Sequence, residues 1–159
     1  MRVLFVCSGN YFRSMAAEYA ARKCLEGRDD ITVSSAGTKV DAGLNPSVVD
    51  DALVATVKLF GIDPSKHVPT QLNKELCSMA DVIVAMDSTH KAYIEKLGYK
   101  ALLYNEAVWG DEVGIYDVGE SLPAGYITDW IPSYQRLAVG YIFATMPIFL
   151  QKVQKLFPS

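Results

Sequence analysis

Near its N-terminus the chain reads Cys7-Ser8-Gly9-Asn10-Tyr11-Phe12-Arg13-Ser14, directly after the apolar run Val3-Leu4-Phe5-Val6. Four apolar residues in succession are typical of a strand that is buried on both faces. The residues that follow, 15–23, are rich in alanine and favour a helix. We therefore expect a strand, a tight loop and a helix start to meet at this stretch.

The residue types in the loop suit the binding of a tetrahedral oxyanion. Five residues separate Cys7 from Arg13, which is enough for the backbone to curl with its N–H groups pointing inward. Gly9 can take positive φ freely, and Asn10 is among the few other residues that tolerate the left-handed region. We interpret the following residues as a phosphate-binding loop: Ser8, Gly9, Asn10, Tyr11, Phe12, Arg13 and Ser14.

The surroundings of Cys7 favour nucleophilic chemistry. The helix dipole, the inward N–H groups and Arg13 all stabilise a thiolate at the carboxyl end of the strand. Arg13 offers a planar fork of donors that matches two phosphate oxygens, and Ser14 can donate its hydroxyl to the sulfur. The alternative is that Cys7 is a small buried hydrophobe and Arg13 a solvated residue. The strand, the Gly-Asn pair and the helix together favour the functional interpretation.

Residues 6–14 resemble the N-terminal signature of the low-molecular-weight protein tyrosine phosphatases, Val-Cys-x-Gly-Asn-x-x-Arg-Ser. The resemblance continues through Ser34-Ser35-Ala36-Gly37-Thr38, Phe60-Gly61-Ile62-Asp63 and residues 80–87, and it thins after Leu97. It implies one phosphatase-like domain over residues 1–159. The expected fold is α/β, a doubly wound four-stranded parallel sheet of order 2-1-3-4 with helices on both faces.

The resemblance also implies an activity. Cys7 would attack phosphorus on a phosphorylated protein or a small aryl phosphate, most simply phosphotyrosine. Arg13 and the loop amides would stabilise the transition state, and a cysteinyl-phosphate intermediate would form. No metal or cofactor is expected.

Four residues would support the strained loop by hydrogen bonds, as the resemblance implies: Asn10, Ser14, Ser35 and His67. Farther along the chain, Asp87 follows an apolar strand and could cap the next helix.

Two carboxylates compete for the role of general acid. The family's Asp-Pro motif is represented by Asp129-Trp130, about 30 residues from the C-terminus with one helix still to come. Asp117 lies in the same long segment. Position along the chain favours Asp129.

Departures from the family pattern leave other activities open. Phe12 stands where some members carry a second cysteine, and Tyr11 replaces a small aliphatic residue or threonine. Residues 38–45 contain no aromatic side chain, so Tyr11 and Trp130 are the candidates for stacking on a phenyl ring.

The alternative functions are a protein-arginine phosphatase, an arsenate reductase-like enzyme and a phosphoprotein-binding module impaired in turnover. The reductases need two further cysteines after the third strand, and this chain has none there.

Composition narrows the class of protein. A length of 159 residues suits one domain, and a net charge of −3 without a basic run argues against nucleic acid as the main partner. The three cysteines, Cys7, Cys24 and Cys77, form no paired spacing, and we see no secretory segment, so a cytoplasmic location is expected. Cys24 is expected to be a core residue of the first helix.

The hydrophobic pattern predicts the other elements. Helices are expected over 14–26, 47–60, 72–79, 88–97 and 132–157, with strands over 31–36, 82–86 and 101–103. The long segment 104–128 is expected to be a functional flap without regular structure.

The apolar run Leu137–Leu150 is too short for a membrane span. Because it is apolar on nearly all sides, we expect either weak homodimerisation through it or burial by the long loop.

Overall fold

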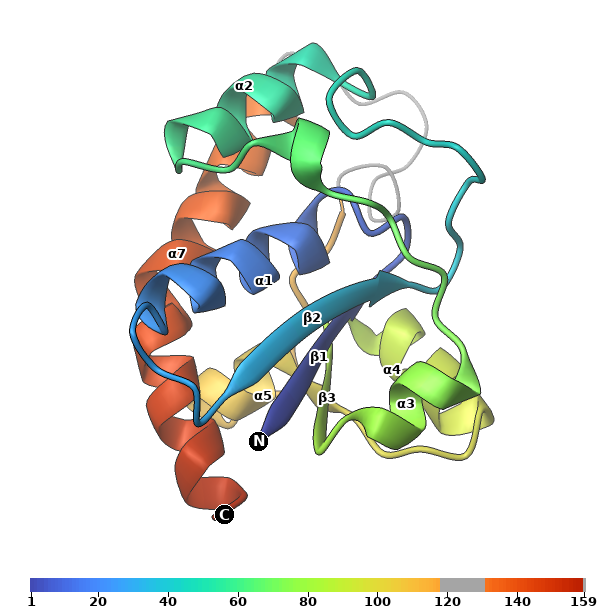
Figure 1. Cartoon of the computed structure of the whole chain (residues 1–159), viewed down its shortest axis with the longest axis vertical. Coiled ribbons are helices and arrows are strands. Elements are labelled where there is room, and N and C mark those ends of the chain that lie inside the picture. The colour runs from blue at the N-terminus through green and yellow to red at the C-terminus, as the bar shows by residue number, and fades with distance from the viewer. Residues whose placement is uncertain (118–130, 159) are drawn as a thin grey trace.

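The computed structural model describes residues 1–117 and 131–158. At its centre lies a parallel sheet with the strand order β2-β1-β3-β4, which confirms the predicted order (Figure 1). The strands are β1 (Arg2–Cys7), β2 (Thr32–Gly37), β3 (Val82–Ala85) and β4 (Leu102–Leu103). Cys7 pairs with Gly37 and Val6 with Ala85, so β1, β2 and β3 all end at the same edge of the sheet.

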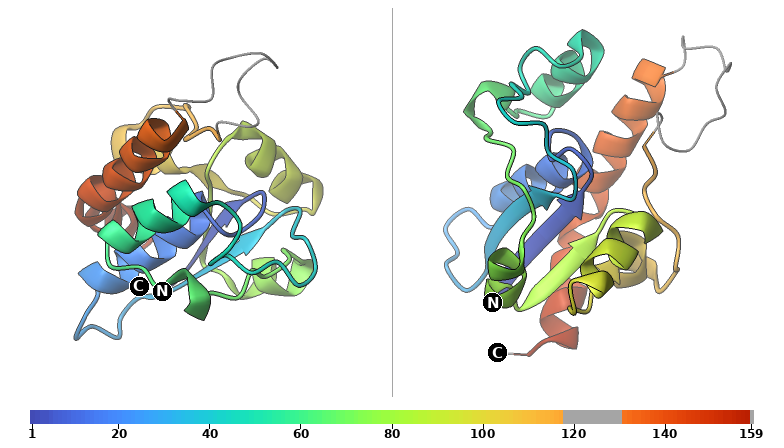
Figure 2. Two further views of the ribbon diagram at one scale, coloured as in Figure 1. Left: turned by 90° about the horizontal axis from the view of Figure 1, so that it is seen from above. Right: turned by 90° about the vertical axis from the view of Figure 1, so that its right-hand side faces the viewer.

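Helices cover both faces of this sheet (Figures 1 and 2). They are α1 (Arg13–Cys24), α2 (Asp51–Leu59), α3 (Lys74–Met79), α4 (Ser88–Lys96), α5 (Tyr104–Trp109) and α7 (Ile131–Leu156), with a 3-10 turn η1 (Pro64–Lys66). Side chains alternate between the two faces along a strand. Val3 and Phe5 of β1 accordingly pack with α1, α2, α5 and α7, whereas Leu4 and Val6 pack with α3 and α4.

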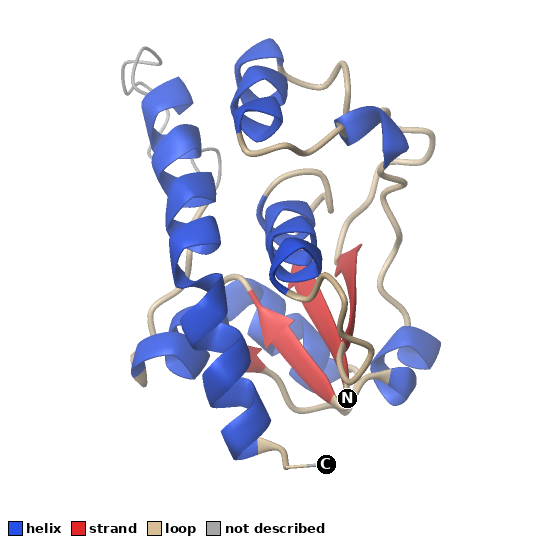
Figure 3. Ribbon diagram, turned by 60° about the vertical axis from the view of Figure 1, so that its left-hand side comes forward, coloured by secondary structure: helices blue, strands red, loops and turns tan. Residues whose placement is uncertain are grey.

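The last helix, α7, is a single long element that runs through Pro147 (Figure 3). Val139, Ile142 and Phe149 are buried in the core against the sheet, and Phe149 stacks on Tyr104 of α5 with ring centroids 5.2 Å apart. Among the described large apolar side chains of the run 137–150, only Leu137 is exposed. Within the described residues the run packs against α1, α2 and α5, and α5 belongs to the long segment that follows β4. No described helix is long and apolar enough to cross a membrane.

Two expectations were wrong. The segment after β4 begins with helix α5 instead of irregular structure, because Tyr104 and Val108 are buried in the core and Glu106 accepts the N–H of Leu103 at 3.0 Å. Cys24 is exposed rather than buried, since it is the last residue of α1, where the helix leaves the core.

Helix α2 starts at Asp51, later than expected, because Asp50 caps it. The carboxylate of Asp50 accepts the N–H groups of Ala52 and Leu53, and its second oxygen accepts Nε2 of Gln135 in α7 at 3.0 Å. Burial raises the pKa of Asp50, but these hydrogen bonds outweigh it and leave the pKa below its ordinary value. Asp50 thus joins two helices as well as starting one.

Asp50→Ala should lower the free energy of unfolding by about 1–2 kcal/mol at about pH 7, the usual cost of losing such a cap. A carboxyl whose pKa is lower in the folded state contributes stability above its unfolded pKa and loses it as the pH falls. The difference between variant and wild type in urea unfolding should therefore shrink at about pH 3. Asp51→Ala, at the exposed next position, should cost less than about 0.5 kcal/mol. Equal losses for the two variants would contradict the capping role.

Candidate active site

The predicted loop joins Cys7 at the end of β1 to Arg13 at the start of α1. Asn10 has a φ of 57° and is the one non-glycine residue with positive φ among the described residues. The reason predicted for Gly9 was wrong, because Gly9 does not have positive φ. An added Cβ on Gly9 would instead lie 2.2 Å from Cε1 of Tyr11. Glycine is needed so that the tyrosine ring can pack against the loop backbone.

A network of hydrogen bonds holds Asn10 in its left-handed conformation. Its side-chain Nδ2 donates to the hydroxyls of Ser14 at 2.9 Å and Ser35 at 2.7 Å. Nε2 of His67 lies 2.7 Å from the carbonyl oxygen of Asn10, and the N–H of Thr70 donates to Oδ1 of Asn10 at 2.8 Å. The structure thus brings together Asn10, Ser14, Ser35 and His67. Burial lowers the pKa of His67 despite its bond to that carbonyl, which favours a neutral ring donating from Nε2.

The sulfur of Cys7 lies 2.9 Å from Oγ of Ser14, and both residues are buried. Ser14 also accepts from Asn10, so its own proton can be directed to the sulfur. A hydroxyl in this place stabilises negative charge on sulfur.

The guanidinium of Arg13 is buried and held by groups from three other parts of the chain. Nη1 donates to Oδ2 of Asp87 at 2.8 Å and to the carbonyl of Ile115 at 2.9 Å, and Nη2 donates to Oδ2 of Asp117 at 3.4 Å. The Ile115 N–H donates to the carbonyl of Met86 at 2.6 Å, which fixes this part of the chain against the end of β3. The arrangement orients the guanidinium before any substrate binds.

Asp87 is the capping residue of α4 as well as the main partner of Arg13. Its Oδ1 accepts the N–H and hydroxyl of Thr89 and the N–H of His90. Burial raises the pKa of Asp87, but the Thr89 hydroxyl and the charges of His90 and Arg13 lower it overall. The carboxylate is therefore charged at neutral pH and can pair with the guanidinium.

Of the two candidate acids, Asp117 lies within the described residues. Asp117 lies at the loop, in contact with Arg13, and its side chain is 30% exposed. The preceding residue is anchored, since the hydroxyl of Tyr134 in α7 donates to the carbonyl of Tyr116 at 2.5 Å. Asp129 and Trp130 lie outside the described residues.

Two glycines let neighbouring segments approach the site closely. A Cβ on Gly37 would lie 2.3 Å from the carbonyl oxygen of Ser8, and a Cβ on Gly114 would lie 2.6 Å from Cβ of Asp87. The segment after Gly37 follows the loop, because the N–H of Lys39 donates to the Ser8 carbonyl at 3.0 Å. Lys39 is exposed at this rim.

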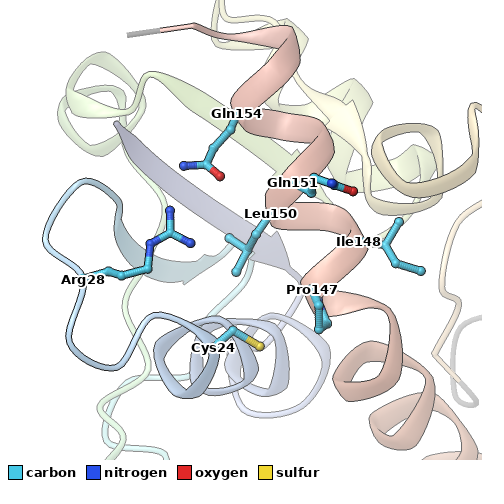
Figure 4. Close-up of a pocket in the computed structure, with 7 residues that line it drawn as sticks. All are labelled: Cys24, Arg28, Pro147, Ile148, Leu150, Gln151 and Gln154. Carbon is cyan, nitrogen blue, oxygen red and sulfur yellow. The ribbon is translucent and has the colours of Figure 1, made fainter.

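A pocket of about 610 Å³ lies elsewhere, between the C-terminal end of α1 and α7 (Figure 4). Cys24, Arg28, Pro147 and Gln151 are among the residues that line it. It is at the opposite end of α1 from Arg13 and does not belong to the site. Within residues 1–117 and 131–158 there is no group of three His, Cys, Asp or Glu side chains that could hold a metal ion.

Three residues of the site are missed by the sequence argument. The sequence predicts only a cap at Asp87, and nothing at His90 or Glu18. Glu18, one helical turn after Ser14, is buried and accepts the hydroxyl of Ser35 at 2.5 Å. Asp87 carried a usable signal, because polar residues that follow parallel strands lie at the edge where such folds bind ligands.

Known proteins resemble this chain in sequence and in fold. A family model described as low molecular weight phosphotyrosine protein phosphatase matches residues 2–107. The low molecular weight protein-tyrosine-phosphatase Ptp of Acinetobacter johnsonii is 33% identical over 94 residues, 59% of this chain and 62% of its own length. Arsenate reductase 2 of Staphylococcus haemolyticus is 31% identical over 86 residues, 54% of this chain and 60% of its own. The matches thus span about three fifths of the length of these curated relatives.

Solved structures match over nearly the whole chain. The YwlE arginine phosphatase from Geobacillus stearothermophilus has a TM-score of 0.75 at 27% identity, covering 98% of this chain and 94% of its own. The low molecular weight protein tyrosine phosphatase from T. tengcongensis has a TM-score of 0.75 at 28% identity, covering 96% and 99%. With the loop built as described and the model matching residues 2–107, the chain belongs to the low molecular weight phosphotyrosine protein phosphatase family.

Proposed function

We propose that the protein hydrolyses a phosphomonoester through a cysteinyl-phosphate intermediate at Cys7. The observation that carries this proposal is the buried Cys7 sulfur, 2.9 Å from the Ser14 hydroxyl, in a loop that leads into the N-terminus of α1. The sulfur would attack phosphorus as the P–O bond to the leaving group breaks. Water would then attack the cysteinyl phosphate, releasing phosphate and restoring the thiolate.

Arg13 and the loop amides would stabilise the charge that develops on the phosphoryl oxygens. Asp87 and the Ile115 carbonyl hold Nη1, so the planar fork is oriented in advance and costs little reorganisation during the reaction. Asn10, Ser14, Ser35 and His67 would keep the loop in its strained shape.

For the general acid we propose Asp117. Of the two candidate acids it is the one that the described residues bring to the loop, and its contact with Arg13 is long enough, at 3.4 Å, for a bound phosphate to replace it. Asp117 would give its proton to the leaving oxygen and take one from the attacking water in the second step. Asp129 remains the rival assignment that the sequence predicts.

The substrate class follows from the family and from Tyr11. Relatives include protein-tyrosine phosphatases and an arginine phosphatase, and one solved structure is of that phosphatase's C7S mutant with a phosphorylated active site serine. We propose phosphotyrosine on a protein, because the Tyr11 ring lies against the loop at Gly9 and can stack on a phenyl ring. Phosphoarginine is the alternative.

The described cysteines do not favour an arsenate reductase. Cys24 is at the far end of α1, about 17 Å along the helix from Arg13 at 1.5 Å per residue. Cys77 is buried in the core on the other face of the sheet from Cys7. Neither thiol is placed to resolve a bond at Cys7.

We keep two further proposals. The cysteines are free, which suits a reducing, cytoplasmic environment. The second is weak self-association through α7, whose exposed large apolar side chains among the described residues are Leu137 and Leu156. Sedimentation at several concentrations tests it, and a strictly monomeric species at high micromolar concentration would contradict it.

Cys7→Ser should abolish steady-state turnover of nitrophenyl phosphate while inorganic phosphate still binds, because the hydroxyl fills the same space but is a far poorer nucleophile. Mass spectrometry of the rapidly quenched wild-type protein should find phosphate on Cys7 during turnover. Cys24→Ser is the matched control and should keep wild-type rates, since this cysteine is exposed and distant. Turnover by the Cys7→Ser protein would refute the covalent mechanism, and no turnover by wild type would favour a binding module.

Asp117→Asn should lower kcat for phenyl phosphate by about 10²-fold or more, the usual worth of general acid catalysis. The loss with nitrophenyl phosphate should be much smaller, because a leaving group of low pKa needs little protonation. Asp129→Asn is the comparison, with losses that do not depend on the leaving group. If Asp129→Asn gives the selective loss and Asp117→Asn does not, Asp129 is the acid.

A further inference from the structure

We propose that His90 is a positioning residue of the phosphate-binding loop and acts through the hydroxyl of Ser8. The proposal deepens the proposed function, since it concerns the same site. His90 lies in the first turn of α4 with its side chain 1% exposed. Its Nε2 is 2.8 Å from Oγ of Ser8, the residue directly after the nucleophile.

Both ring nitrogens of His90 have partners. Nδ1 lies 3.2 Å from the backbone nitrogen of Asp87 and 3.1 Å from its carboxylate Oδ1. Nε2 lies 2.8 Å from Oγ of Ser8. The imidazole ring therefore joins the residue after the nucleophile to the first turn of α4, and its buried position leaves it little room to turn.

The same helix start holds Arg13. One oxygen of Asp87 binds Nη1 of Arg13, while the residue's backbone N–H binds His90. The direction of the Ser8 hydroxyl and the direction of the guanidinium fork are thus set from one point, the N-terminus of α4. A shift of this turn would move both donor groups relative to the sulfur of Cys7.

The loop is held from both sides by the two histidines of the chain. His67 binds the carbonyl of Asn10 from the β2 side, and His90 binds Ser8 from the α4 side. Pinning Ser8 fixes the first peptide groups after Cys7. Amides that already point inward stabilise the transition state without reorganisation, so phosphate affinity and rate should both depend on this contact.

Two substitutions separate this role from simple capping of α4. The side-chain amide of asparagine lies near the position of Nδ1. His90→Asn can therefore still accept the N–H of Asp87 but cannot reach Ser8. Glutamine reaches as far as Nε2, so His90→Gln can still form a hydrogen bond with Ser8. Tyr93→Phe, on the same helix at an exposed position, serves as the control.

The readouts are kcat/KM for nitrophenyl phosphate and the protection of Cys7 from iodoacetamide by inorganic phosphate, with alkylation at residue 7 located by peptide mapping. His90→Asn should weaken phosphate protection and lower kcat/KM by about tenfold each, the scale of one lost hydrogen bond to an anion site. His90→Gln should stay within about threefold of wild type, even if it melts at a lower temperature. A His90→Asn protein with wild-type values, or a His90→Gln protein as impaired as His90→Asn, would overturn the proposal.

A double-mutant cycle tests the route through Ser8. In a Ser8→Ala background, His90→Asn should have no further effect on phosphate protection. Losses that multiply would show that His90 acts elsewhere and would overturn the proposal. If wild-type protein is protected by phosphate but hydrolyses no aryl phosphate, the proposed function fails while protection still tests His90. Absence of protection in wild type would overturn both.

Discussion

The buried ion pair between Arg13 and Asp87 is the interaction on which the rest of the site depends. The two side chains are 1% and 2% exposed, and removing two charges from water costs several kcal/mol each unless both are well bonded. The remaining Asp87 oxygen is satisfied by the first turn of α4, and Nη1 of Arg13 also binds the Ile115 carbonyl. Since α1 and α4 pack on opposite faces of the sheet, this pair joins the two layers at the edge where β1 and β3 end. In open α/β sheets, ligands bind at the carboxyl ends of neighbouring strands whose following helices lie on opposite faces of the sheet.

The second constraint is the left-handed conformation of Asn10. Strain of this kind costs of order 1–3 kcal/mol and persists only where the surroundings enforce it. Here the enforcing groups come from distant parts of the chain, Ser35 in β2 and the segment that carries His67 and Thr70. The loop and the folded domain therefore stabilise each other. A chain that had not assembled the sheet could not hold the loop in this shape.

The sequence was most informative where a pattern is local. The apolar run before Cys7, the Gly-Asn pair and the helix behind it predicted the loop, and family resemblance added the strand order and the partners of Asn10. The sequence did not predict the contacts between segments that lie far apart in the chain. Nothing in a single sequence shows that Asp87 faces Arg13 or that His90 faces Ser8, because each pair is separated by more than 70 residues. The conformation of Gly9 was misjudged for a similar reason, since the need for glycine comes from where a neighbouring ring packs.

Gly37 and Gly114 touch the two most important parts of the site without contributing a functional group. One lies against the carbonyl of Ser8 and the other against the backbone of Asp87, each closer than any Cβ could approach. A survey that truncates side chains one at a time would pass over both positions, because there is nothing to remove. Their contribution becomes visible only when atoms are added, so a saturation library would be expected to find the least tolerant positions of this protein at residues that carry no chemistry.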